Sequence, residues 1–174
     1  MAIWPFRRSR AESDAARLLG AVTAASRNPA LFGAGRVHDT LEGRFELMTL
    51  HAALALMRLQ REPALEPLAQ AFTDRLFRQF DAGLREAGVG DTSVPKRMRR
   101  MAGDFYGRLR AYADALSETG NGALADALAR NVLGGHAPDF ARELANYART
   151  AAAAQAAAPV EALMGADGWP PLES

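Results

Sequence analysis

The sequence predicts an all-α fold, a single compact domain of about five to six helices. Alanine is abundant, and only 7% of the 174 residues are aromatic, a composition typical of closely packed helices. Apolar residues recur every three or four positions, and no segment alternates as a strand does. We expect the domain to span 11–158, between a loose basic segment at 1–10 and a loose tail at 159–174.

Three helices are predicted in the first half of the chain. The first spans about 11–27, where Ser9 and Glu12 form a capping box. The second begins near Asp39, a good N-cap, and runs to about the next proline. The third spans about 64–87 and ends at a glycine. Two apolar stripes should face the core: Leu41, Phe45, Met48, Ala52, Ala55 and Leu59 in the second helix, and Leu65, Leu68, Ala69, Phe72, Leu76, Phe80 and Leu84 in the third.

Three more helices are predicted in the second half. One runs from Pro95, a residue suited to a first helical position, to about Leu116. A short helix follows at about 123–133, and a last one at about 138–157. The helix from Pro95 has an apolar arc of about 100°, made of Met98, Met101, Ala102, Phe105, Leu109, Tyr112 and Leu116.

Charge is concentrated in this same helix. The whole chain has a net charge of +1, yet residues 91–110 hold six basic against two acidic side chains. The basic residues lie outside the apolar arc: Lys96, Arg97, Arg99, Arg100, Arg108 and Arg110. This cationic face is either an ordinary solvated surface or a contact for an acidic protein, anionic lipid or nucleic-acid phosphates. Nucleic acid is the least favoured, because the basic residues are not interleaved with exposed aromatic side chains.

No motif predicts catalysis. The chain has no cysteine, and its three histidines, His38, His51 and His136, lack metal-ligand spacing. Glycine-rich phosphate loops and nucleophile elbows are also missing from the sequence. We therefore expect a protein that is not an enzyme, with no cofactor and no metal. His51 lies between apolar residues, which favours a hydrogen-bonded histidine within a helix.

Membrane contact, if any, is expected to be peripheral. The longest charge-free apolar stretch, Leu47 to Met57, is far shorter than the roughly 20 residues that span a bilayer. Trp4 and Phe6 next to Arg7 and Arg8 are typical of a membrane interface. We expect a cytoplasmic protein, in part at the cytoplasmic face of the inner membrane.

Two segments resemble the ubiquinol–cytochrome c chaperone family. Residues 39–59 contain the elements GRFE and LHA, and residues 78–116 contain GVGDTSVPKRM and FYGRL. The resemblance implies an all-helical, non-enzymatic assembly factor of ubiquinol–cytochrome c reductase that acts on newly made cytochrome b. Mitochondrial relatives act with a small partner protein and associate with the translating ribosome. The alternative is a peripheral adaptor that binds anionic lipid or nucleic acid through the basic helix 95–110.

The expected binding residues combine this resemblance with the charge pattern. Asp91 and Ser93 should also cap the helix that follows them. Met98 and Met101 are expected to be core residues first and adaptable client contacts second. The hypothetical client- or partner-binding set is Phe45, His51, Asp91, Ser93, Lys96, Arg97, Arg99, Arg100, Tyr106 and Arg108.

Overall fold

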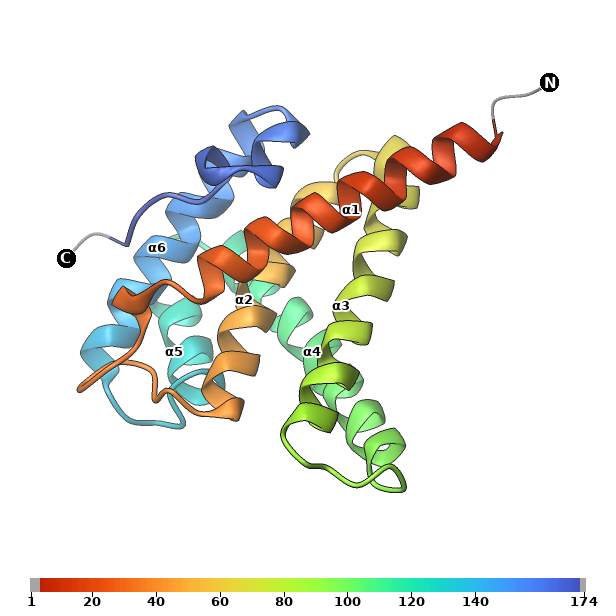
Figure 1. Cartoon of the computed structure of the whole chain (residues 1–174). Helices are drawn as coiled ribbons and strands as arrows, with labels where there is room; N and C mark the ends of the chain where they lie inside the picture. Colours follow the sequence, from red (N-terminus) through yellow and green to blue (C-terminus); the bar gives the residue numbers. More distant parts are fainter. Residues whose placement is uncertain (1–3, 173–174) are drawn as a thin grey trace.

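The computed structural model describes residues 4–172, with side chains from residue 10 onward, and this part is all-α (Figure 1). This confirms the predicted fold class. The helices are α1 (Trp4–Ser26), α2 (Leu41–Leu59), α3 (Glu66–Glu86), α4 (Val94–Ser117), α5 (Gly122–Asn131) and α6 (Pro138–Ala157). None of them has both the length and the apolarity of a membrane span.

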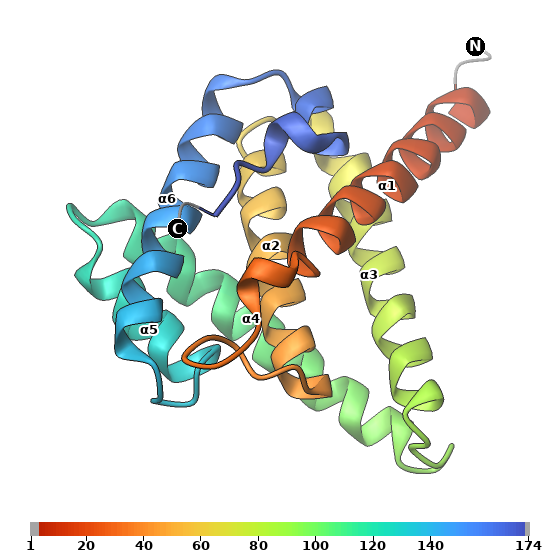
Figure 2. The ribbon, with the colours of Figure 1, turned by 60° about the vertical axis from the view of Figure 1, so that its left-hand side comes forward.

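Helix α2 forms the centre of the molecule. It contacts α1, α3, α4 and α6, and every residue from Glu46 to Leu56 is buried. Figure 2 shows α2 with α3 on one side and α5 and α6 on the other. The sequence predicted a single buried stripe, but a helix enclosed by neighbours is buried on all sides. Leu41, at the start of the expected stripe, is 43% exposed instead.

Two hydrophobic cores lie on opposite sides of α2. One joins α2 to α5, α6 and the second half of α4, with Tyr112, Leu128 and Leu144 fully buried. The other joins α2 to α1, α3 and the first half of α4, with Phe72 and Phe105 fully buried. The two cores share α2 and α4, which therefore fix the position of the remaining helices.

Several predicted helix ends differ in the structure. Helix α1 begins at Trp4, so positions 9 and 12 lie inside it and cannot form its N-terminal capping box. Helix α2 is capped by Thr40, whose Oγ1 accepts a 3.1 Å hydrogen bond from the Gly43 amide. The carboxylate of Asp39, the predicted cap, binds Arg44 at 2.6 Å.

The C-terminal segment folds back onto the helices. It forms two short 3₁₀ turns, Val160–Met164 and Ala166–Gly168, after α6 ends. The indole Nε1 of Trp169 donates to the Leu163 carbonyl at 3.1 Å, and its ring packs against both cores. The segment 160–169 is therefore part of the packed structure.

Candidate functional site

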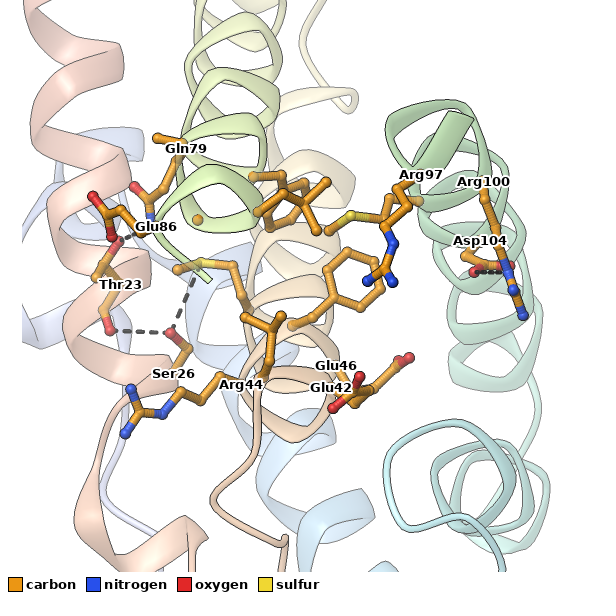
Figure 3. A pocket seen from close by; sticks show the side chains of 18 of the residues that line it. Thr23, Ser26, Glu42, Arg44, Glu46, Gln79, Glu86, Arg97, Arg100 and Asp104 are labelled. Atoms are coloured by element: carbon orange, nitrogen blue, oxygen red, sulfur yellow. Dashed lines mark hydrogen bonds and ion pairs between the residues drawn. The ribbon is translucent and has the colours of Figure 1, made fainter. Parts of the chain in front are cut away.

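A groove of about 850 Å³ opens where four helices meet (Figure 3). The C-terminal end of α1, the first half of α2, the second half of α3 and the first half of α4 supply its walls. Its apolar lining includes Leu41, Phe45, Met48, Phe80, Leu84 and Met101. Phe45 and Phe80 pack edge to face with their ring centroids 5.0 Å apart. The groove therefore offers aromatic and flexible thioether surface to an apolar partner.

Charged side chains surround this apolar lining. The arginines are Arg27, Arg44, Arg97, Arg100 and Arg108, and the acids are Glu42, Glu46, Glu86 and Asp104. In Figure 3, Arg97 and Arg100 lie on the α4 side, and Glu86 lies across the groove beside Thr23 and Gln79. An apolar lining with a mixed polar rim is the usual anatomy of a protein-binding surface.

One ion pair fastens α2 to α4 beside the groove. Arg108 donates from Nε and Nη2 to the two carboxylate oxygens of Glu46, at 2.5 and 2.6 Å. The side chains are only 12% (Glu46) and 18% (Arg108) exposed. Burial raises the pKa of the Glu46 carboxyl, and Arg108 partly offsets this effect. Burial opposes the charge of Arg108, but its bonds to Glu46 raise the pKa of the guanidinium above its ordinary value.

The same pair orients a groove residue. The Arg108 guanidinium carbon lies 6.0 Å from the centroid of the Phe45 ring, within cation–π range. Arg108 was predicted to lie on the outward cationic face, but it turns inward because α2 provides a carboxylate partner. Glu46 was expected on a solvated face of its helix, but it is buried. It stands in the GRFE element, and Arg108 stands in FYGRL. The two motif elements thus meet at this ion pair.

The predicted binding residues do not form one site. Phe45, Arg97, Arg100 and Arg108 line the groove, whereas Lys96 and Arg99 are exposed outside it. Tyr106, 52% exposed, lies at a separate hollow with Leu56, Leu59 and Leu109. The side chains of Trp4, Phe6, Arg7 and Arg8 lie outside the part of the chain that the structure describes.

His51 is a core residue and offers no surface to a client. It is fully buried, and its Nδ1 donates to the Leu47 carbonyl at 2.7 Å. The carbonyl can only accept, so Nδ1 bears the proton and Nε2 accepts from the Tyr147 hydroxyl at 2.9 Å. Burial lowers the pKa of His51 to about 4. The prediction of a hydrogen-bonded helix histidine is confirmed, and a direct client contact is not compatible with this burial.

Asp91 and Ser93 do not cap α4 with their side chains. Ser93 occupies the N-cap position but makes no side-chain capping bond. The Asp91 carboxylate accepts from Arg85 of α3 instead. The predicted cap was wrong because the Asp91 carboxylate pairs with a cationic donor from α3 and caps no amide of α4. Met98 and Met101 are partly buried against the core, and Met101 also reaches the groove.

Comparison with known proteins identifies the family. The profile of the family described as "Ubiquinol-cytochrome C chaperone" matches residues 34–167. The chain belongs to the ubiquinol–cytochrome c chaperone family. The matched range includes α2, α3 and α4 and hence most of the groove.

A solved structure supports the same assignment. The crystal structure of the Cbp3 homolog from Brucella abortus is 39% identical in sequence and aligns with a TM-score of 0.79. The alignment covers 97% of this chain and 94% of the Brucella chain. None of the curated proteins compared with the chain matches it.

Proposed function

We propose that this protein is a non-enzymatic assembly chaperone that holds newly made cytochrome b in the groove during assembly of ubiquinol–cytochrome c reductase. The observation that carries this proposal is the groove itself, an apolar surface with a charged rim in a member of this chaperone family. A membrane protein that has not yet joined its partner subunits exposes apolar helix faces, which require a temporary partner of this kind.

The chemistry of the groove fits such a client. Phe45 and Phe80 provide a firm aromatic surface, while Met48 and Met101 adapt to irregular apolar side chains. The charged rim keeps the empty groove compatible with water and orients polar residues that flank an apolar client segment. Release needs no chemical step, because the client leaves when its reductase partners cover the same apolar face more extensively.

The location and further partners of the protein belong to the same proposal. We place this protein at the cytoplasmic face of the inner membrane, near the translating ribosome from which its client would emerge. A peripheral anionic-lipid adaptor is the second candidate, and one observation favours it. Lys96, Arg99 and Arg110 are exposed, and none of them forms an ion pair within the described residues.

The decisive experiment compares two exposed apolar residues that differ in location. Leu41 lines the groove and is 43% exposed, whereas Tyr106 lies outside it and is 52% exposed. Each is changed to glutamate, and cytochrome b that copurifies from solubilised membranes is measured by quantitative mass spectrometry. We expect Leu41→Glu to lower recovery at least about fivefold, since it places a charge against an apolar client, while Tyr106→Glu retains wild-type recovery. Equal recovery with both variants would place the client elsewhere.

A further inference from the structure

The outward face of α4 forms a surface separate from the groove. Its members are all exposed, and we call them the outward strip: Lys96, Arg99, Gly103, Tyr106, Gly107 and Arg110. They lie on one side of the helix, away from the buried residues Phe105 and Tyr112. None of the six lines the groove. The strip therefore needs its own explanation.

Tyr106 is a half-exposed aromatic anchor at one edge of the strip. It is 52% exposed, although its ring packs on two others. The ring centroid lies 6.1 Å from that of Phe77, on which it stacks, and 5.4 Å from that of Phe105. Beside it lies a hollow of about 410 Å³ that includes Leu56, Leu59 and Leu109. Polar residues line the rest of the hollow: Gln60, Glu62, Glu66, Gln70 and Thr73. A tyrosine packed in this way beside a partly apolar hollow is a typical interface anchor, because little side-chain entropy is lost on binding.

Positive charge lies along the strip on one side of this anchor, and no acidic group among the described residues pairs with it. Lys96, Arg99 and Arg110 form no ion pair in the part of the chain that the structure describes. The arginines beside the strip do form ion pairs. Arg100 pairs with Asp104, and Arg108 pairs with Glu46 and Asp104. Such a surface favours an acidic partner. Glu62 and Glu66 line the far side of the hollow, so the acidic groups of the partner must lie over α4.

The two glycines of the strip allow a close approach. A Cβ at Gly103 or Gly107 would have no atom within 4 Å, so packing within the chain does not require glycine there. Glycine inside a helix lowers its stability relative to alanine. Gly103 and Gly107 are one turn apart on the strip, so their missing side chains leave the backbone of α4 open to close approach by a facing helix.

We propose that the outward strip docks an acidic amphipathic helix of a second protein. An apolar residue of that helix would pack on Tyr106 and the hollow, and its carboxylates would meet Arg99 and Arg110. The groove remains open in this arrangement, so the proposal does not depend on which client the groove holds.

The proposal is tested with the full chain and two labelled helical peptides. One peptide is built from leucine, alanine and glutamate, and in its twin every glutamate is replaced by lysine. Binding is measured by fluorescence anisotropy, and flotation with phosphatidylglycerol vesicles tests the lipid alternative. The variants are Arg99→Gln with Arg110→Gln, and Gly103→Gln with Gly107→Gln. The control, Arg130→Gln with Arg142→Gln, removes the same charge from α5 and α6.

We expect the acidic peptide to bind and its lysine twin not to bind. Neutralising Arg99 and Arg110 should weaken binding about tenfold, the effect expected for two exposed charge contacts, and the control should not change it. The glycine variant should weaken binding while keeping or raising the melting temperature. Three results would overturn the proposal. The two peptides could bind the wild-type protein equally, or either strip variant could bind the acidic peptide as tightly as the wild type does. The protein could also float with the vesicles through the strip without binding the acidic peptide.

Discussion

At the scale of single residues, Gly43 has no space for a side chain. A Cβ at this position would lie 2.1 Å from the His38 carbonyl oxygen and 2.9 Å from Val37 Cγ1. The backbone of the preceding loop would have to move, so we expect Gly43→Ala to lower the free energy of unfolding by about 1–3 kcal/mol. Gly20→Ala in α1 is the control, because a Cβ there meets no atom within 4 Å. Chemical denaturation measures both, and equal stabilities would contradict the prediction.

His51 makes stability depend on pH in a defined direction. Burial lowers its pKa in the folded state to about 4, whereas an unfolded histidine has a pKa of about 6.5. The unfolded state therefore binds the extra proton first, and stability is lost as the pH falls from about 6.5 towards 4. Between pH 7.5 and pH 5 we expect this residue alone to lower the free energy of unfolding by about 2 kcal/mol.

A His51→Gln variant isolates this effect. Glutamine keeps a polar side chain near Leu47 and Tyr147 but does not titrate. Urea denaturation of both proteins at the two pH values should give a steeper loss for the wild type. A variant with the same pH dependence would show that other groups cause it. Glu46 is not among them, because the raised pKa of its carboxyl in the folded state acts in the opposite direction.

The sequence predicted what kind of residue His51 is but not which atoms it meets. An apolar neighbourhood in a helix was enough to predict burial and a hydrogen bond, yet Tyr147 comes from α6, far along the chain. Asp91 shows the opposite case, since a local capping rule named the wrong partner. Its actual partner, Arg85, became accessible only through the turn between α3 and α4. Local rules fail where a charged donor from another element competes with a backbone amide.

At the scale of elements, Arg149 of α6 holds the C-terminal end of α4. Its guanidinium donates to the carbonyls of Leu116 at 3.0 Å, Ala115 at 3.2 Å and Gly120 at 2.6 Å. The carbonyls of Ala115 and Leu116 lie in the last turn of α4 and have no partner within the helix, and the Gly120 carbonyl lies in the turn that follows. Arg149 therefore supplies the hydrogen-bond donors that these carbonyls would otherwise lack. We expect Arg149→Met to lower the free energy of unfolding by about 2–3 kcal/mol.

An exposed arginine on the same helix provides the comparison. Arg142→Met removes a side chain that contacts only Asp139 on the surface, and we expect a loss below about 0.5 kcal/mol. Thermal and urea denaturation should separate the two variants clearly. Similar stabilities would mean that solvent replaces Arg149 at the end of α4.

Helix positions were more predictable than helix environments. The pattern of apolar residues and the prolines placed α4 and α6 within a residue or two of their observed ends. The burial of α2 on all sides could not be read from its own stripe, because it depends on four neighbouring helices. The start of α1 at Trp4 was not predicted, because the basic residues near the start of the chain were interpreted as a loose segment.

At the scale of the whole molecule, the groove is a product of the fold. Thr23, Glu42, Glu86 and Arg97 line it from four helices, and no spacing in the sequence brings them together. The resemblance to a chaperone family led us to expect a client-binding surface, and three residues of the expected binding set on α4 line the groove: Arg97, Arg100 and Arg108. The other walls required the packing of α1, α2 and α3.

The last prediction concerns the cell. Deletion of the gene should reduce assembled ubiquinol–cytochrome c reductase while other respiratory complexes persist, since the proposed client is specific to the reductase. Wild type should restore the complex, and the groove variant Leu41→Glu should restore much less at equal protein level. The strip variant Gly103→Gln with Gly107→Gln leaves the groove unchanged. Comparing its rescue with that of the wild type therefore measures separately whether assembly requires the docked helix. Blue native electrophoresis and reductase activity measure the outcome. Normal reductase in the deletion strain, or full rescue by Leu41→Glu, would contradict a client-binding role for the groove.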